Sequence, residues 1–191
     1  MQIVSIIIAA LLSENYVLVK FLGICPFLGV SKRINAALGM GMAVTFVMAL
    51  TSFVCYFVYQ LLILLDLAYM QTVAFILVIA SVVQLVEMFL KKKIPGLYKA
   101  LGVYLPLITT NCAVLAVVLT NAQKDYNLLF SIINGTASGL GFTLAIVLFS
   151  SLRERVDKAT PPECFKGTPI ALIAAGLLAL AFMGFSGLRF S

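Results

Sequence analysis

Apolar stretches of about 20 residues recur along this chain, and each is long enough, as a helix, to cross the ~30 Å hydrocarbon core of a bilayer. Hydrophobic residues make up 63% of the 191 residues and charged residues only 10%. A soluble domain of this size has no means of burying so much apolar surface. The sequence therefore predicts an all-α integral membrane protein that forms a single membrane domain over residues 1–191.

Segment lengths and polar breaks predict six transmembrane helices. They cover residues 3–24, 37–62, 71–90, 101–120, 127–150 and 169–188. Ten of the thirteen Lys and Arg residues fall in the loops after the first, third and fifth spans. These ten are Lys32, Arg33, Lys91, Lys92, Lys93, Lys99, Arg153, Arg155, Lys158 and Lys166. Because cytoplasmic loops carry the excess of basic residues, we expect both termini on the extracytoplasmic side.

Short matches recur in the same order in the two halves of the chain. Ala37-Leu-Gly-Met-Gly41 matches Ala137-Ser-Gly-Leu-Gly141, and Ala74-Phe-Ile-Leu matches Ala171-Leu-Ile-Ala. Each half holds three spans, so the second half enters the membrane upside down relative to the first. The sequence thus predicts two inverted three-helix repeats, about 1–95 and 96–191, related by a pseudo-two-fold axis in the membrane plane. We interpret the shared glycines as sites of close helix packing.

A third match is a pair of cysteines, Cys25 and Cys112, 87 positions apart in two similar apolar segments. Gly23 and Pro26 flank Cys25, and the polar run Thr109-Thr110-Asn111 precedes Cys112. Proline removes a backbone donor and glycine adopts unusual dihedrals, which predicts a broken helix at each cysteine. The N–H and C=O groups of an irregular backbone at membrane depth need hydrogen-bond partners from the protein or from a water-filled cavity.

Paired thiols favour Fe–S, Zn or Cu(I) as a bound centre. The chain has no histidine, which excludes haem, zinc or copper held by histidine, and acid–base catalysis centred on it. A [2Fe–2S] cluster normally takes four cysteines, so two would come from a partner. The alternative is that both cysteines are inert packing residues. Cys55 is expected to be a small core residue of its span, and Cys164 an ordinary residue of a polar loop.

Three runs resemble a known family of membrane subunits. They are Asn15-Tyr-Val-Leu-Val-Lys-Phe-Leu-Gly-Ile-Cys-Pro-Phe-Leu-Gly-Val-Ser-Lys32, Leu105-Pro-Leu-Ile-Thr-Thr-Asn-Cys-Ala113 and Ala181-Phe-Met-Gly-Phe-Ser-Gly187. The chain is similar, over essentially its whole length, to the RnfA (RsxA) family of the Rnf (Rsx) electron-transport complexes. The NqrE component of the sodium-pumping NADH:quinone reductase is a close relative of that family.

The resemblance implies a subunit of a translocase in the bacterial cytoplasmic (inner) membrane. Such complexes couple electron transfer between ferredoxin and NAD to the movement of sodium ions or protons. It implies a homologous partner, RnfE, in the opposite orientation, with a [2Fe–2S] cluster held by two cysteines from each. The ligands carried over to this chain are Cys25 and Cys112. The flavins, the other clusters and the NAD site would belong to the neighbouring components RnfB, RnfC, RnfD and RnfG.

Two further function classes stay open from the residues alone. A small secondary transporter with the same repeat would bind a solute at the midplane, through Glu14 and Asn111. A purely structural subunit would need neither cysteine. Glu14, predicted near the middle of the first span, is also a candidate for an ion path or for a pair with Lys20. Nucleic-acid binding is not expected, because the basic residues only punctuate the loops.

Overall fold

A computed structural model describes residues 7–8, 10–11, 15–31, 34–93, 105–158, 162 and 165–184. Within these ranges the regular elements are all helical, as predicted. They are α2 (Ile24–Val30), α3 (Ile34–Leu64), η2 (Ala68–Met70), α4 (Gln71–Lys93), α6 (Leu105–Thr109), α7 (Cys112–Gln123), α8 (Leu128–Lys158) and α9 (Thr168–Met183).

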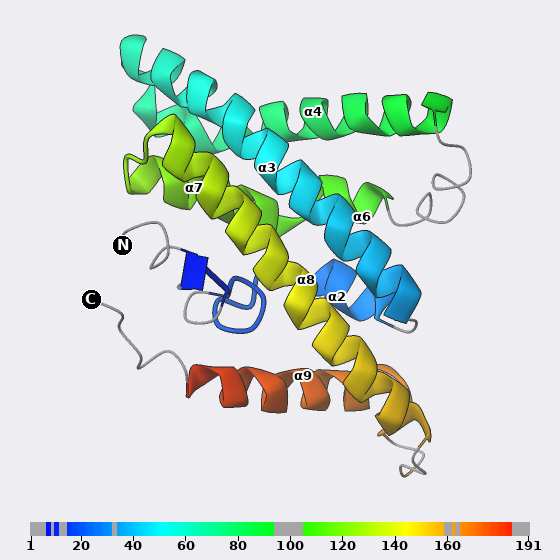
Figure 1. Ribbon diagram of the computed structural model, residues 1–191. Helices are drawn as coiled ribbons and strands as arrows, with labels where there is room; N and C mark the ends of the chain where they lie inside the picture. The colour runs from blue at the N-terminus through cyan, green and yellow to red at the C-terminus, as the bar shows by residue number, and fades with distance from the viewer. Residues whose placement is uncertain are drawn as a thin grey trace.

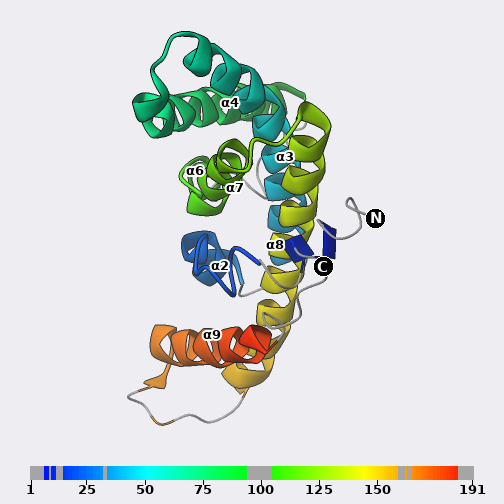
Figure 2. The same cartoon turned by 90° about the vertical axis from the view of Figure 1, so that its left-hand side faces the viewer.

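The two longest helices, α3 and α8, lie side by side and form the spine of the molecule (Figure 1). The shorter helices follow one another along one side of this spine, with α4 at one end and α9 at the other (Figure 2). Helices α6, α7 and α2 lie between those two ends. This arrangement brings segments from both halves of the sequence to the same side of the α3–α8 pair.

Glycines allow α3 and α8 to cross closely. A methyl group at Gly41 would lie 2.6 Å from the Thr143 side chain, and one at Gly139 would lie 2.6 Å from the Thr45 backbone. The hydroxyl oxygens of Thr45 and Thr143 are 3.1 Å apart, and these two residues are 98 positions apart in sequence. The crossing is thus reciprocal, with Gly41 equivalent to Gly139. The sequence match instead aligns Gly39 with Gly139, two positions away, and nothing lies within 4 Å of a methyl group at Gly39.

Three of the described helices are long and apolar enough to cross a membrane. They cover Ile34–Leu64, Gln71–Phe89 and Leu128–Val156, close to the second, third and fifth predicted spans. The shorter apolar helices Leu107–Gln123 and Thr168–Met183 lie at the fourth and sixth predicted spans. The six-span inverted repeat remains a prediction, which the reciprocal crossing of α3 and α8 supports.

Several boundaries differ from the sequence prediction. Helix α4 continues to Lys93, so it includes Lys91, Lys92 and Lys93, which were expected in the loop after a third span ending at residue 90. The first span was expected to run to residue 24, but the backbone from Asn15 to Gly23 forms turns before α2 begins. The fifth span was expected to end at residue 150, with Arg153, Arg155 and Lys158 in a loop, but α8 continues to Lys158. Basic residues stabilise the last turn of a helix because they complement its dipole, so a charge cluster alone does not end one.

Candidate functional site

The two predicted cysteine segments lie next to one another in the fold. Cys25 is the second residue of α2 and Cys112 is the first residue of α7. The backbone N–H of Gly23 donates a hydrogen bond to Cys112 Sγ over 2.8 Å, across 89 positions of sequence. Both cysteines are free and exposed on the surface of the chain. A hydrogen bond from a backbone amide to sulfur is a contact that stabilises a thiolate ligand.

The predicted break beside Cys25 is observed as the irregular backbone of residues 15–23, which starts at Asn15. The Asn15 side-chain oxygen accepts hydrogen bonds from the N–H groups of Val17 (3.0 Å) and Leu18 (3.3 Å). The Asn15 amide nitrogen donates to the Gly141 carbonyl of α8 over 3.0 Å. Phe21 and Gly23 then adopt positive φ angles, 57° and 85°, and reverse the chain before α2. The side chain of Asn15 thus supplies the protein partners that an irregular backbone at membrane depth requires.

The predicted break at Cys112 is also observed, and Asn111 organises it. Helix α6 ends at Thr109 and α7 begins at Cys112. The Asn111 side-chain oxygen accepts a hydrogen bond from the Ala113 N–H over 3.1 Å, which caps α7. Asn111 is 4% exposed, so its oxygen serves the helix end rather than a solute. This use of Asn111 disfavours the transporter hypothesis.

The two segments touch through Gly23. A methyl group at Gly23 would lie 3.0 Å from Asn111 Oδ1, 3.1 Å from Ala113 Cβ and 3.2 Å from Phe142 Cε2. The position also has a left-handed backbone, which side chains other than hydrogen disfavour. Glycine is therefore required at position 23 both for the turn and for the close approach of the two cysteine segments.

Helix α2 is attached to the spine by α8. The rings of Phe27 and Phe149 stack with their centroids 4.2 Å apart. One turn further along α8, an Arg153 guanidinium nitrogen donates to the Leu28 carbonyl and to the Ser31 hydroxyl, each over 2.8 Å. Arg153 is only 7% exposed, which corrects the prediction that it is a loop residue. Sequence reasoning missed this role because the positive charge looked like part of the cytoplasmic basic cluster.

The other residues that the sequence singled out are distributed as follows. Cys55 is buried in α3, in agreement with a packing role. Lys20 is exposed, with its ammonium 4.6 Å from the centre of the Tyr16 ring. Glu14 and Cys164 lie outside the described residues, so their predicted roles stay predictions.

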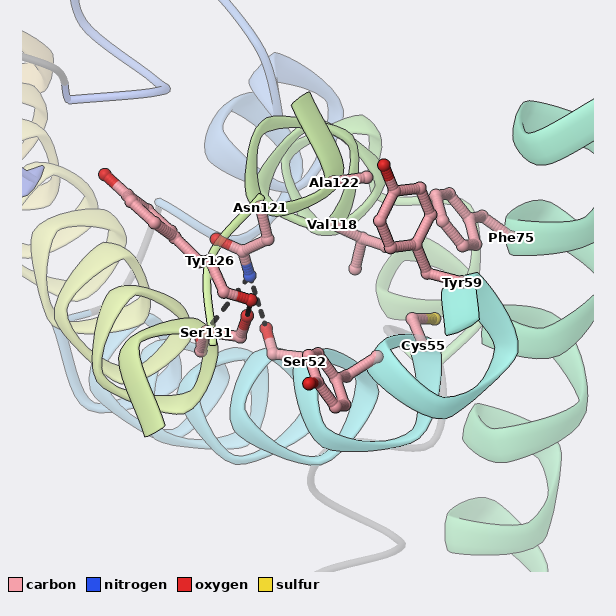
Figure 3. A pocket seen from close by; sticks show the side chains of 10 residues that line it. Ser52, Cys55, Tyr59, Phe75, Val118, Asn121, Ala122, Tyr126 and Ser131 are labelled. Atoms are coloured by element: carbon pink, nitrogen blue, oxygen red, sulfur yellow. Dashed lines mark hydrogen bonds between the residues drawn. The ribbon is translucent and has the colours of Figure 1, made fainter. Parts of the chain in front are cut away.

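A second feature, a buried polar cluster, was not predicted. A cavity of about 20 Å³, the size of one water molecule, is lined by residues of α3, α4, α7 and α8 and by Tyr126 between α7 and α8 (Figure 3). Asn121 spans it: its amide nitrogen donates to the Ser131 carbonyl (3.3 Å) and to the Ser52 hydroxyl (3.5 Å), and its oxygen accepts from Asn134 (2.7 Å). Asn121 follows Cys112 by nine residues, about 13 Å along α7. The cluster is therefore separate from the cysteine site, and its hydrogen bonds join α3, α7 and α8.

Comparison with known proteins identifies the family of this chain. The family model described as "Rnf-Nqr subunit, membrane protein" matches residues 3–189. The chain belongs to the Rnf-Nqr family. The RnfA component of the Na(+)-translocating ferredoxin:NAD(+) oxidoreductase complex of Acetobacterium woodii is 59% identical over 190 residues, 99% of each chain. The family resemblance that the cysteine motifs indicated is thereby confirmed, and so is the assignment to a membrane protein.

Two further Rnf-Nqr relatives are named as the corresponding component of an ion-translocating oxidoreductase complex. The protein from Syntrophotalea carbinolica is 56% identical over 189 residues, which cover 98% of this chain and 97% of the relative. The protein from Azotobacter vinelandii is 54% identical over 189 residues, with the same coverage. The likeness therefore extends over the whole chain and includes both cysteine segments.

Proposed function

We propose that this chain is the RnfA component of an ion-translocating ferredoxin:NAD+ oxidoreductase complex in the bacterial inner membrane, with both termini extracytoplasmic. Within that complex, Cys25 and Cys112 supply two of the four ligands of a [2Fe–2S] cluster, and a homologous subunit in the opposite orientation supplies the other two. The ion that is moved is sodium or the proton. The assignment of the complex follows the names of relatives that are 54–59% identical over nearly the whole chain.

The observation that carries the cluster proposal is the meeting of the two cysteine segments. Cys25 and Cys112 belong to different halves of the sequence. Nevertheless, the backbone N–H of Gly23, just before α2, donates a hydrogen bond to the sulfur of Cys112 at the start of α7. Both thiols are free and exposed, as ligands must be if a second subunit completes the site. Among the described residues no group of three His, Cys, Asp or Glu side chains is placed to hold a metal ion. The two cysteines therefore fit half of a four-cysteine site.

The chain's own residues would prepare this half-site in two ways. The Gly23 N–H donates a hydrogen bond to the Cys112 sulfur. Asn111 and Asn15 satisfy the broken backbone on either side. When bound, a [2Fe–2S] cluster accepts and releases one electron, so a pair of such subunits would carry electrons through the bilayer.

The experiment compares the whole complex with variants in which one cysteine is changed, Cys25→Ser or Cys112→Ser. Cys55→Ala is the matched control, because Cys55 is buried in α3. EPR spectra, iron and acid-labile sulfide are measured on purified complexes of equal subunit content. We expect each serine variant to lose one reducible [2Fe–2S] signal and about two irons per complex, and Cys55→Ala to lose neither. Retention of the signal and the iron in both serine variants would overturn the cluster proposal.

A further inference from the structure

The helix that carries Cys25 is too short to be stable without contacts from other elements. Helix α2 has seven residues, and its N-cap residue, Gly23, makes no side-chain capping hydrogen bond. Isolated helices shorter than about 12 residues are marginal even in favourable sequences. The backbone carbonyls of the last turn of a helix also need partners from elsewhere. The placement of Cys25 therefore depends on contacts that other elements make with α2.

Helix α8 makes those contacts from two successive turns. Phe149 stacks on Phe27, and both rings are fully buried. Arg153 donates to the Leu28 carbonyl, one of the carbonyls that the last turn of α2 leaves without a partner in its own helix, and to the hydroxyl of Ser31 just after the helix. Ser31 is completely buried. Arg153 thus holds the last turn of α2 at Leu28, three residues or roughly 4.5 Å of rise beyond Cys25, and at Ser31, just after the helix.

Burying the charged side chain of Arg153 costs desolvation free energy. The residue is within the apolar run Leu128–Val156 and is 7% exposed. Charged residues are almost never so deeply buried unless they are paired or hydrogen-bonded, as Arg153 is to Leu28 and Ser31. A buried positive charge near an iron–sulfur cluster favours the reduced form, because the cluster becomes more negative on reduction. The energetic cost and the location of Arg153 point to a role at the redox centre.

We propose that Arg153 is a positioning residue for the Cys25 ligand and that its buried charge raises the reduction potential of the cluster. This inference rests on the proposed function, because it assumes that Cys25 is a cluster ligand. The positioning acts through the hydrogen bonds to Leu28 and Ser31, and the charge acts through space. Arg153→Lys keeps the charge without the planar fork of donors, whereas Arg153→Met removes both. The two variants therefore separate the two effects.

The test uses the purified whole complex with Arg153→Met, Arg153→Lys and Ser31→Ala. Arg155→Met is the matched control, since Arg155 lies only two residues further along α8 but is exposed. Three quantities are measured: the EPR line shape, the reduction potential of the cluster, and the retention of its iron during a challenge with a chelator. The Cys25→Ser variant is prepared in parallel to establish that the signal belongs to this site.

For Arg153→Met we expect a lower reduction potential, an altered line shape, and iron loss to the chelator that is about 10-fold easier, as is typical when the outer partners of a metal ligand are removed. Arg153→Lys is expected to retain the potential but to show the altered line shape. Ser31→Ala should show a smaller change in line shape, and Arg155→Met should match the wild type. If Arg153→Met does not assemble, Arg153→Lys and Ser31→Ala carry the test.

Wild-type line shape, potential and iron retention in every assembled Arg153 and Ser31 variant would overturn this inference. If Cys25→Ser meanwhile removes the signal, the proposed function stands and only the role of Arg153 fails. If Cys25→Ser keeps the signal, the proposed function itself fails. The two failures are therefore distinguishable in one set of samples.

Discussion

The two cysteine segments reach the same site by different physical means. Cys112 begins a helix of 12 residues, and the neighbouring Asn111 caps that helix. Cys25 lies in a helix of seven residues without a side-chain cap, and Phe149 and Arg153 of α8 hold that helix in place. The position of Cys112 is thus largely specified by its own local sequence. The position of Cys25 is specified by residues more than a hundred positions away.

This difference has a consequence for dynamics. A segment held by tertiary contacts opens when those contacts are lost, whereas a capped helix opens when its own cap is lost. Hydrogen exchange followed by mass spectrometry separates the two cases, because peptides covering residues 24–31 and 112–123 report on them individually. We expect the amides of α2 to exchange faster than those of α7 in the isolated subunit.

The largest effect is expected from Phe149→Ala. Removing a fully buried ring that stacks on Phe27 leaves a cavity. We expect the free energy of unfolding to fall by about 3 kcal/mol, the low end for such changes because lipid is itself apolar. Exchange should rise in residues 24–31 and change little in residues 112–123. Leu148→Ala is the control, since Leu148 is 40% exposed. Equal acceleration in both peptides would show that the two segments are not held separately.

An intermediate effect is expected from Gly23→Ala, which acts on both segments at once. The added methyl group meets Asn111, Ala113 and Phe142 at 3.0–3.2 Å, and the left-handed backbone penalises it further. We expect the free energy of unfolding to fall by about 2 kcal/mol, which lowers the melting temperature of the purified complex. Gly39→Ala is the matched control, because nothing lies within 4 Å of a methyl group there. Similar melting temperatures for the two variants would contradict the close approach at Gly23.

The smallest effect is expected from Asn111→Ala, which removes the cap of α7. The expected cost is about 1 kcal/mol, the usual value for losing an N-cap. Exchange should rise in residues 112–123 and not in residues 24–31, the reverse of Phe149→Ala. Asn111→Ser restores a capping oxygen and should restore slow exchange. If serine fails to do so, capping is not what Asn111 contributes.

Much of the site was predictable from local signals. Gly23 and Pro26 indicated the break at Cys25, and the polar run ending in Asn111 indicated the break at Cys112. These are short-range effects of backbone chemistry, which one segment contains in full. The end of α8 was placed too early, since a basic cluster resembles a loop although it also stabilises the end of a helix. The equivalence of Gly41 with Gly139 required knowledge of which side chains interdigitate at the crossing.

The amino-acid sequence by itself determined that the chain is helical and apolar and that it belongs to a membrane family. It also indicated a helix break beside each of Cys25 and Cys112, because backbone propensity and freedom act between neighbouring residues. Only the tertiary structure decided that Gly23 meets Cys112, that Arg153 is buried against Leu28 and Ser31, and that Asn121 joins three helices around a small cavity. Those facts depend on how separate helices pack, and helices that are apolar all round carry no stripe that specifies which faces meet.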